Sequence, residues 1–182
     1  QRQMCIRDRD VAAELRLQIV NGDIEAGTLL TENQVAKQFD VSRSPVRDAF
    51  KLLQTDQLIQ LERMGAKVLQ FGEQEKKELY DLRLMLESFA FSKIKHLDTA
   101  TIVQEMRKHL EMMKVAIKFD DAEAFTQHDI QFHEATIKAS NHQYLLTFWS
   151  HLKPVIESLV LISMRQRMAV SYTHLTLPTK RI

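Results

Sequence analysis

Apolar residues recur every three or four positions along most of the chain, which is the spacing of one face of an α-helix. Near the start this spacing is carried by Val11, Leu15 and Ile19. Asp10 stands directly before them and is suited to an N-cap, and Asn21-Gly22 is suited to the left-handed end of a helix. We therefore predict a first helix from Asp10 to Asn21.

Two short helices joined by a tight turn are predicted next. Thr31 and Gln34 have the spacing of a capping box and open a helix that ends at Asp40. Ser42 can cap the following helix, and Pro45 falls in its first turn, where the missing amide hydrogen costs little. That helix has two distinct faces, an apolar one of Val46, Ala49, Phe50 and Leu53 and a polar one of Arg43, Arg47, Lys51 and Gln54.

One segment alternates in the manner of a β-strand, over residues 58–69. Residues 58–61 and 67–69 can pair as a hairpin across a turn at Met64-Gly65, where glycine permits a positive φ. Arg63 and Lys67 flank the tip of this hairpin.

The tight turn and the early arginines of the third helix match the geometry of a helix-turn-helix. The first residues of its second helix reach base edges, and the fork of an arginine can bind O6 and N7 of guanine together. We therefore predict that Arg43 and Arg47 contact DNA, while Arg63 and Lys67 on the hairpin wing meet phosphates or the minor groove. The alternative is that both arginines are solvated charges on a small helical domain.

The rest of the chain reads as four amphipathic helices without internal glycine, at about 73–96, 98–119, 121–139 and 142–168. The first of them has an apolar stripe, which we predict to be buried in the core: Leu79, Leu82, Leu86 and Phe89 or Ala90. The predicted fold is mostly α: an N-terminal winged helix-turn-helix with a small β-hairpin wing over 10–71, then an antiparallel α-helical bundle over 73–168.

Composition narrows this picture. A formal net charge of +1 on 182 residues excludes a generally basic surface, so DNA binding must use a local patch. Cys5 is the single cysteine, which allows no intrachain disulfide. The longest mostly apolar stretch, 154–164, is shorter than the roughly 20 residues of a membrane span. We expect a cytoplasmic protein without a membrane partner.

The order of these elements, and above all the run TENQVAKQFDVSRSPVRDAFKLLQTDQLIQLERMGAKV, resembles the GntR family of bacterial regulators, in its FadR-like branch with an FCD effector domain. The resemblance covers about 10–168. It implies base contacts by Arg43 and Arg47, phosphate or base-edge contacts by Ser42 and Ser44, and entry of Gly65 into the minor groove; we add Asn33, from the same run, to the expected DNA-binding residues. Ala26 and Asp40 depart from the usual Pro and Gly, but Asp tolerates the left-handed region, so the turn survives.

The two ends differ from the middle. Residues 1–9 and 169–182 resemble translated sequencing-adapter sequence, and we interpret both as non-native; a native disordered tail is the alternative. On this interpretation the FCD domain is truncated at about Met168.

The stretch ELYDLRLMLESFA resembles the opening helix of the FCD domain. There Arg83 would point into the ligand cavity and bind the carboxylate of a small effector, which a guanidinium can hold with two hydrogen bonds. The alternative is a solvent-facing Arg83 bonded to Glu87, four residues on.

Asp129 and His133 lie four residues apart on one predicted helix, so their side chains share a face and are close enough to share a cation, while His128 points elsewhere. The stretch HDIQFHEATIKASNHQYL resembles the FCD signature, in which such an Asp and His are two ligands of a divalent metal, often zinc or nickel. The family's other ligands are histidines on later helices, beyond Met168, so the site is incomplete here. His151 is a poor substitute and His174 belongs to the suspect tail. Without the resemblance, an Asp and a His at this spacing would usually be a surface pair, with a metal site as the less common alternative.

These features favour a ligand-responsive transcription regulator that is not an enzyme, which binds a palindromic double-stranded DNA operator as a homodimer when intact. An all-α metal-binding enzyme is the first alternative, but no Gly-rich phosphate loop, nucleophile elbow or HExxH motif supports it. A helical interaction module is the second, because Leu145, Phe148 and Trp149 would suit a helix–helix interface.

Overall fold

The computed structural model describes residues 8–96 and 99–175. The chain divides into two units that are described separately: Gln1–Arg83 with Ser150–Ser158, and Leu84–Trp149 with Leu159–Ile182. Cys5 and most of the two segments interpreted as non-native lie outside the described residues. Their inner parts, 8–9 and 169–175, are helical.

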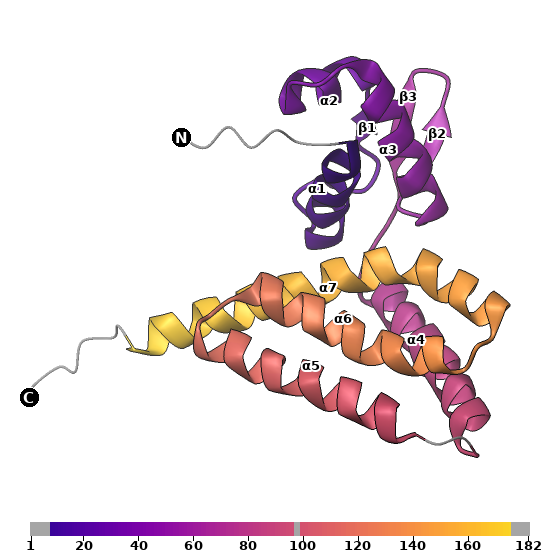
Figure 1. The fold of residues 1–182 in the computed structure, drawn as a ribbon. Coiled ribbons are helices and arrows are strands. Elements are labelled where there is room, and N and C mark those ends of the chain that lie inside the picture. Colours follow the sequence, from indigo (N-terminus) through magenta and orange to yellow (C-terminus); the bar gives the residue numbers. More distant parts are fainter. Residues whose placement is uncertain (1–7, 97–98, 176–182) are drawn as a thin grey trace, which may run out of the picture. The chain divides into compact units, whose positions relative to one another are not determined.

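The first unit contains the predicted helices and the wing (Figure 1). Its elements are α1 (Asp8–Asn21), β1 (Leu29–Leu30), α2 (Glu32–Phe39), α3 (Arg43–Thr55), β2 (Ile59–Glu62) and β3 (Gly65–Val68). Helix α1 ends where the sequence predicted but begins two residues earlier, so the prediction of Asp10 as N-cap is wrong. Asp10 lies in the first turn instead.

The turn of the helix-turn-helix forms as predicted. Thr31 and Gln34 make both hydrogen bonds of the capping box, and Asp40 ends α2 in the left-handed conformation with φ 53°. Ser42 takes the N-cap position of α3, but its side chain makes no capping hydrogen bond. Pro45 at the third helical position has no amide hydrogen, which removes one of the two usual donors to such a hydroxyl.

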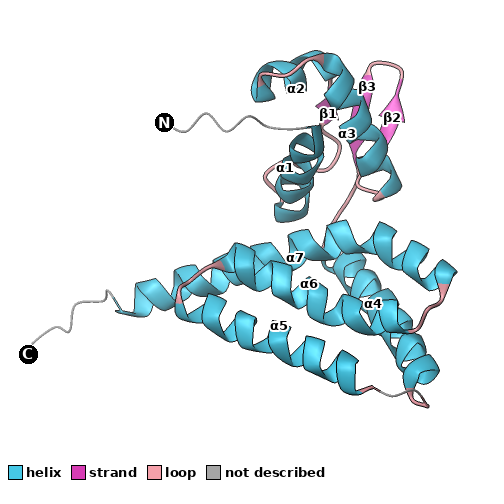
Figure 2. Cartoon of the chain, viewed as in Figure 1, coloured by secondary structure: helices cyan, strands magenta, loops and turns pink. Residues whose placement is uncertain are grey.

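The wing is a three-stranded antiparallel sheet in the order β1-β3-β2, and Figure 2 shows its strands in magenta. In its register Glu62 is opposite Gly65, so Arg63 and Met64 form the turn, one residue earlier than predicted. Strand β1, in which Leu29 pairs with Lys67, was not predicted. A Cβ on Gly65 would overlap the carbonyl oxygen of Leu30, so glycine is needed for β1 to approach β3.

The core of the first unit lies between α1, α3 and the wing. Its fully buried side chains include Val11, Leu15, Val46, Leu53, Leu58 and Val68. At its edge Arg16 donates from Nε to Oδ2 of Asp56 over 2.8 Å, with both side chains nearly buried. Burial raises the pKa of the Asp56 carboxyl more than the neighbouring Arg16 lowers it.

The remaining helices are α4 (Glu73–Ile94), α5 (Ala100–Lys118), α6 (Ala122–Ala139) and α7 (Gln143–Leu175). They agree with the four predicted helices, except that α7 continues past Met168, while the predicted start at Asp98 lies outside the described residues. Helices α5 and α6 lie side by side in the second unit (Figure 1). A small apolar core in this unit joins three helices through Ala90, Ile137, Leu145 and Trp149.

The predicted apolar stripe of α4 is only partly core. Ala90 is fully buried and Leu86 is partly buried, whereas Leu82 and Phe89 are exposed. The helices that pack here contact the Ala90 side of α4 and leave the neighbouring face open.

Helix α7 contributes residues to the core and is also apolar over most of its length. Trp149 and Leu145 are buried core residues, so of the predicted interface residues only Phe148 is exposed. The segment Gln143–Ala169 is long and apolar enough to cross a membrane by length and composition, although the predicted apolar stretch was shorter. A helix from the core of a globular protein passes the same test, so this is weak evidence for a membrane span.

The close approach of β1 to Gly65 predicts a specific mutational cost. Gly65→Ala forces β1 away from β3 and lowers the free energy of unfolding by about 1–3 kcal/mol, to be measured by chemical denaturation. Gly27→Ala is the control, because Gly27 also has a positive φ but open space around its Cβ position. If the free energy of unfolding falls equally in Gly65→Ala and Gly27→Ala, the strain of a positive φ alone explains the loss of stability.

Candidate nucleic-acid interface and effector-domain residues

The apolar face of α3 is buried as predicted, and this leaves its polar face in solvent. Val46, Ala49, Phe50 and Leu53 are buried, whereas Arg43, Arg47, Lys51 and Gln54 are exposed. Packing therefore fixes the direction in which both arginines project.

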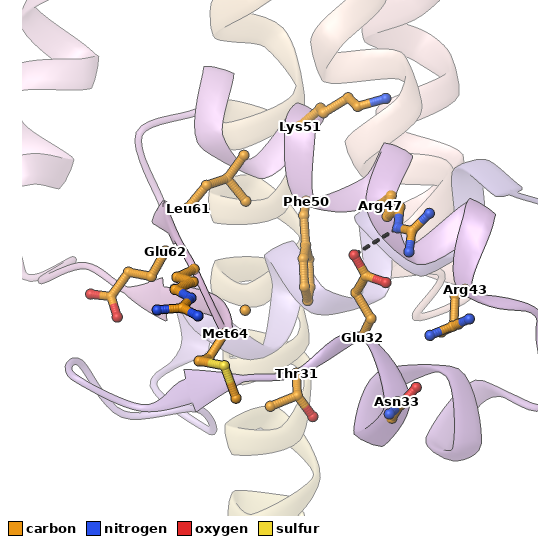
Figure 3. Close-up of a pocket in the computed structure, with 12 residues that line it drawn as sticks. Thr31, Glu32, Asn33, Arg43, Arg47, Phe50, Lys51, Leu61, Glu62 and Met64 are labelled. Atoms are coloured by element: carbon orange, nitrogen blue, oxygen red, sulfur yellow. Dashed lines mark hydrogen bonds and ion pairs between the residues drawn. The ribbon is translucent and has the colours of Figure 1, made fainter.

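The polar face of α3 borders a surface hollow of about 580 Å³ between α2, α3 and the wing (Figure 3). Its charged lining residues are Glu32, Arg43, Arg47, Lys51, Glu62 and Arg63. Asn33 and Gly65 line it too, so the structure brings five of the eight predicted DNA-binding residues together. The other three, Ser42, Ser44 and Lys67, are exposed but do not line the hollow.

Glu32 is a member of this surface that the sequence reasoning missed. Nε of Arg47 donates to Oε1 of Glu32 over 2.7 Å, from the third helix to the first turn of the second. The hydrogen bond from Arg47 lowers the pKa of Glu32, and the same bond raises the pKa of Arg47. The two residues are 15 positions apart, so no helical spacing signals the pair.

In the second unit, Asp129 and His133 share a face of α6 as predicted. Nε2 of His133 lies 3.7 Å from Oδ1 of Asp129, and its Nδ1 lies 2.7 Å from Oε2 of Glu87 on α4. The imidazole therefore stands between two carboxylates. In the described part of the chain no three His, Cys, Asp or Glu side chains form a group that could hold a metal ion.

His128 points away from this pair, as predicted. Its Nδ1 lies 3.1 Å from Nδ1 of His109 on α5, so one ring must donate and the other accept. Burial, with a smaller effect of His128, lowers the pKa of His109, which favours the neutral ring that such a bond requires.

Arg83 is half-buried on α4, one turn before Glu87. Its expected part in effector binding remains a prediction.

Comparison with known proteins identifies the family of this chain. Residues 7–68 match the model described as bacterial regulatory proteins, gntR family, and residues 78–175 match the FCD domain. The chain belongs to the GntR family. It is 49% identical to the gluconate operon transcriptional repressor of Bacillus subtilis over 91% of this chain and 68% of the relative, and 48% identical to that of Bacillus licheniformis over 89% and 67%.

Solved structures agree with the fold. Escherichia coli McbR/YncC has a TM-score of 0.61 at 21% identity, covering 91% of this chain and 82% of that one. A putative GntR regulator from Rhodococcus sp. RHA1 has a TM-score of 0.58 at 24% identity, covering 93% and 86%. The family models and the Bacillus relatives confirm the resemblance to GntR regulators with an FCD domain, and the solved structures confirm the fold. Because the two Bacillus relatives are transcriptional repressors, the expectation that the chain is not an enzyme is also confirmed.

The exposed arginines of this GntR regulator predict a loss of sequence discrimination. Arg43→Ala and Arg47→Ala each weaken binding to a preferred duplex by roughly 5- to 150-fold, because each removes a guanidinium that can bind guanine with two hydrogen bonds. Lys67→Ala weakens binding to preferred and scrambled duplexes alike. It also lowers the slope of log K against log salt concentration by about one unit, as expected for a phosphate contact.

Gel-shift titrations at several salt concentrations separate the two effects. Undiminished affinity for the preferred duplex in both arginine variants, with an unchanged melting temperature, would contradict the assignment of α3 as recognition helix.

Proposed function

We propose that this chain is a cytoplasmic repressor that binds a palindromic DNA operator as a homodimer and responds to a small carboxylate effector. The observation that carries the proposal is the exposed arginine face of α3 beside the wing. Helix α3 is 13 residues long, so it spans only a few base pairs of the major groove. Two copies related by two-fold symmetry would read two half-sites about one helical turn apart.

The effector class follows from the relatives and from the residues of the FCD domain. The two Bacillus relatives are named repressors of a gluconate operon, and gluconate is a small hydroxylated carboxylate. Arg83 offers a guanidinium suited to a carboxylate. We therefore propose a sugar acid, with gluconate as the first compound to test.

A divalent metal ion is part of the proposal, with Asp129 and His133 as two of its ligands. Carboxylate and imidazole suit zinc or nickel, and two ligands of one tetrahedral ion stand about 3.3 Å apart, close to the 3.7 Å between these side chains. Glu87 fits the same arrangement, because a metal-binding histidine commonly gives its other ring N–H to a carboxylate.

Such an ion, when bound, supplies a Lewis acid that can ligate the effector carboxylate. Two protein ligands fall short of the usual three or four, so the described residues alone hold the ion weakly.

Selection from a random duplex library tests the function. We expect the chain to enrich a palindromic sequence, to bind it less tightly as salt increases, and to release it on addition of gluconate. Recovery of a single half-site would contradict the homodimer, and no enrichment over input would contradict DNA recognition. Unchanged binding with gluconate and a panel of other sugar acids would contradict only the effector class.

Substitution of two histidines on the same helix tests the proposed metal ligands. We expect His133→Ala to abolish the binding of Zn²⁺ and Ni²⁺ in calorimetric titrations, whereas His128→Ala retains it, because His128 faces His109. Equal binding in the unaltered chain and His133→Ala would show that α6 supplies no metal ligand.

A further inference from the structure

A carboxylate on a surface that binds DNA needs an explanation, because it repels phosphates. Glu32 lines the hollow between α2, α3 and the wing, beside Arg43 and Arg47. We propose that Glu32 is a positioning residue that orients Arg47 for guanine recognition and thereby increases discrimination between sequences. This proposal rests on the DNA-binding function proposed above.

The backbone of Glu32 is held in place before DNA arrives. It is the first residue of α2 and follows Thr31, whose capping box with Gln34 fixes the start of the helix. The buried Val35 and Ala36 anchor the same short helix to the core. The positive end of the helix dipole also favours a charged carboxylate at this position. Glu32 is therefore a fixed point against which a longer side chain can be oriented.

The contact uses one particular edge of the Arg47 guanidinium. Nε donates to Glu32, and this nitrogen is not needed when guanine is bound end-on, through Nη1 and Nη2. The side chain of Arg47 remains 55% exposed, and its bond to Glu32 is made through Nε. The ion pair thus restricts the flexible Arg47 side chain and leaves Nη1 and Nη2 for guanine. Less conformational entropy is then lost when DNA binds.

The negative charge of Glu32 and its ion pair with Arg47 affect DNA binding in different ways. Repulsion between Glu32 and the DNA backbone weakens binding to every sequence, whereas the oriented fork strengthens binding only where guanine is present. Only the orientation of Arg47 increases the ratio of affinities for preferred and scrambled DNA, because the repulsion lowers both affinities alike.

The experiment is a double-mutant cycle between Glu32 and Arg47, measured on the best duplex selected by the unaltered chain and on a scrambled duplex. We expect Glu32→Ala to reduce the affinity ratio roughly tenfold. In the Arg47→Ala background the same change should leave the ratio unaltered, because there is no fork to orient. Glu32→Gln should largely retain the ratio, since its amide oxygen can still accept from Nε, while it binds both duplexes more tightly.

Glu62→Ala is the matched control. It removes an exposed carboxylate from the same hollow, so it should strengthen binding to both duplexes without changing their ratio. If Glu32→Ala also lowers the affinity ratio in the Arg47→Ala background, Glu32 either contacts a base itself or only supports α2. Either result would overturn the proposal.

A second measurement needs no DNA. In nitrogen-15 NMR spectra of the free chain, the Nε–H of Arg47 should exchange with water more slowly than that of Arg43, and this protection should survive Glu32→Gln and disappear in Glu32→Ala. If no duplex is enriched, the proposed function fails, yet this result still decides whether Glu32 holds Arg47. Equal exchange of the two arginines would refute the positioning role.

Discussion

Burial of one face of α3 is the constraint on which the geometry of the DNA-binding unit depends. Val46, Ala49 and Leu53 are fully buried, and burial of a valine or leucine side chain contributes about 1.5–3 kcal/mol relative to exposure. Since side chains are fixed around a helix axis, holding this face against the core also fixes the face of Arg43 and Arg47. Rotation of α3 would expose the apolar residues, so the arginines cannot turn inward without unfolding the unit.

The parts of this arrangement that depend on local chemistry were predictable from the sequence. The capping box of Thr31, the left-handed Asp40 and the two faces of α3 each follow from residues within one or two turns of one another. Ser42 shows how far such reasoning reaches. Its position at the N-cap was predicted correctly, but its side chain makes no capping bond, and Pro45 three residues later removes one of the two usual donors.

The parts that depend on chain segments meeting in space were not predictable. Strand β1 has only two residues, too few for an alternating pattern, and its place is set by pairing with Lys67 and Ala66 far along the chain. In the same way Glu87 meets His133 across 46 residues, and no spacing rule connects them. The candidate metal ligands Asp129 and His133 were found because both lie on one helix, whereas the carboxylate on the other side of the imidazole required the fold.

Two ion pairs in the first unit show why burial, rather than the chemistry of the partners, separates supporting residues from binding residues. Arg16 and Asp56 are nearly removed from water, and the cost of desolvation outweighs their attraction so far that the pKa of Asp56 rises. Their bond ties α1 to the end of α3, and the low exposure of both side chains keeps them from a partner. Glu32 and Arg47 make a bond of nearly the same length in solvent, where the carboxylate stays charged and the guanidinium keeps an accessible edge. An arginine that is held at Nε but still exposed is already ordered for recognition, whereas a buried one can only hold the fold together.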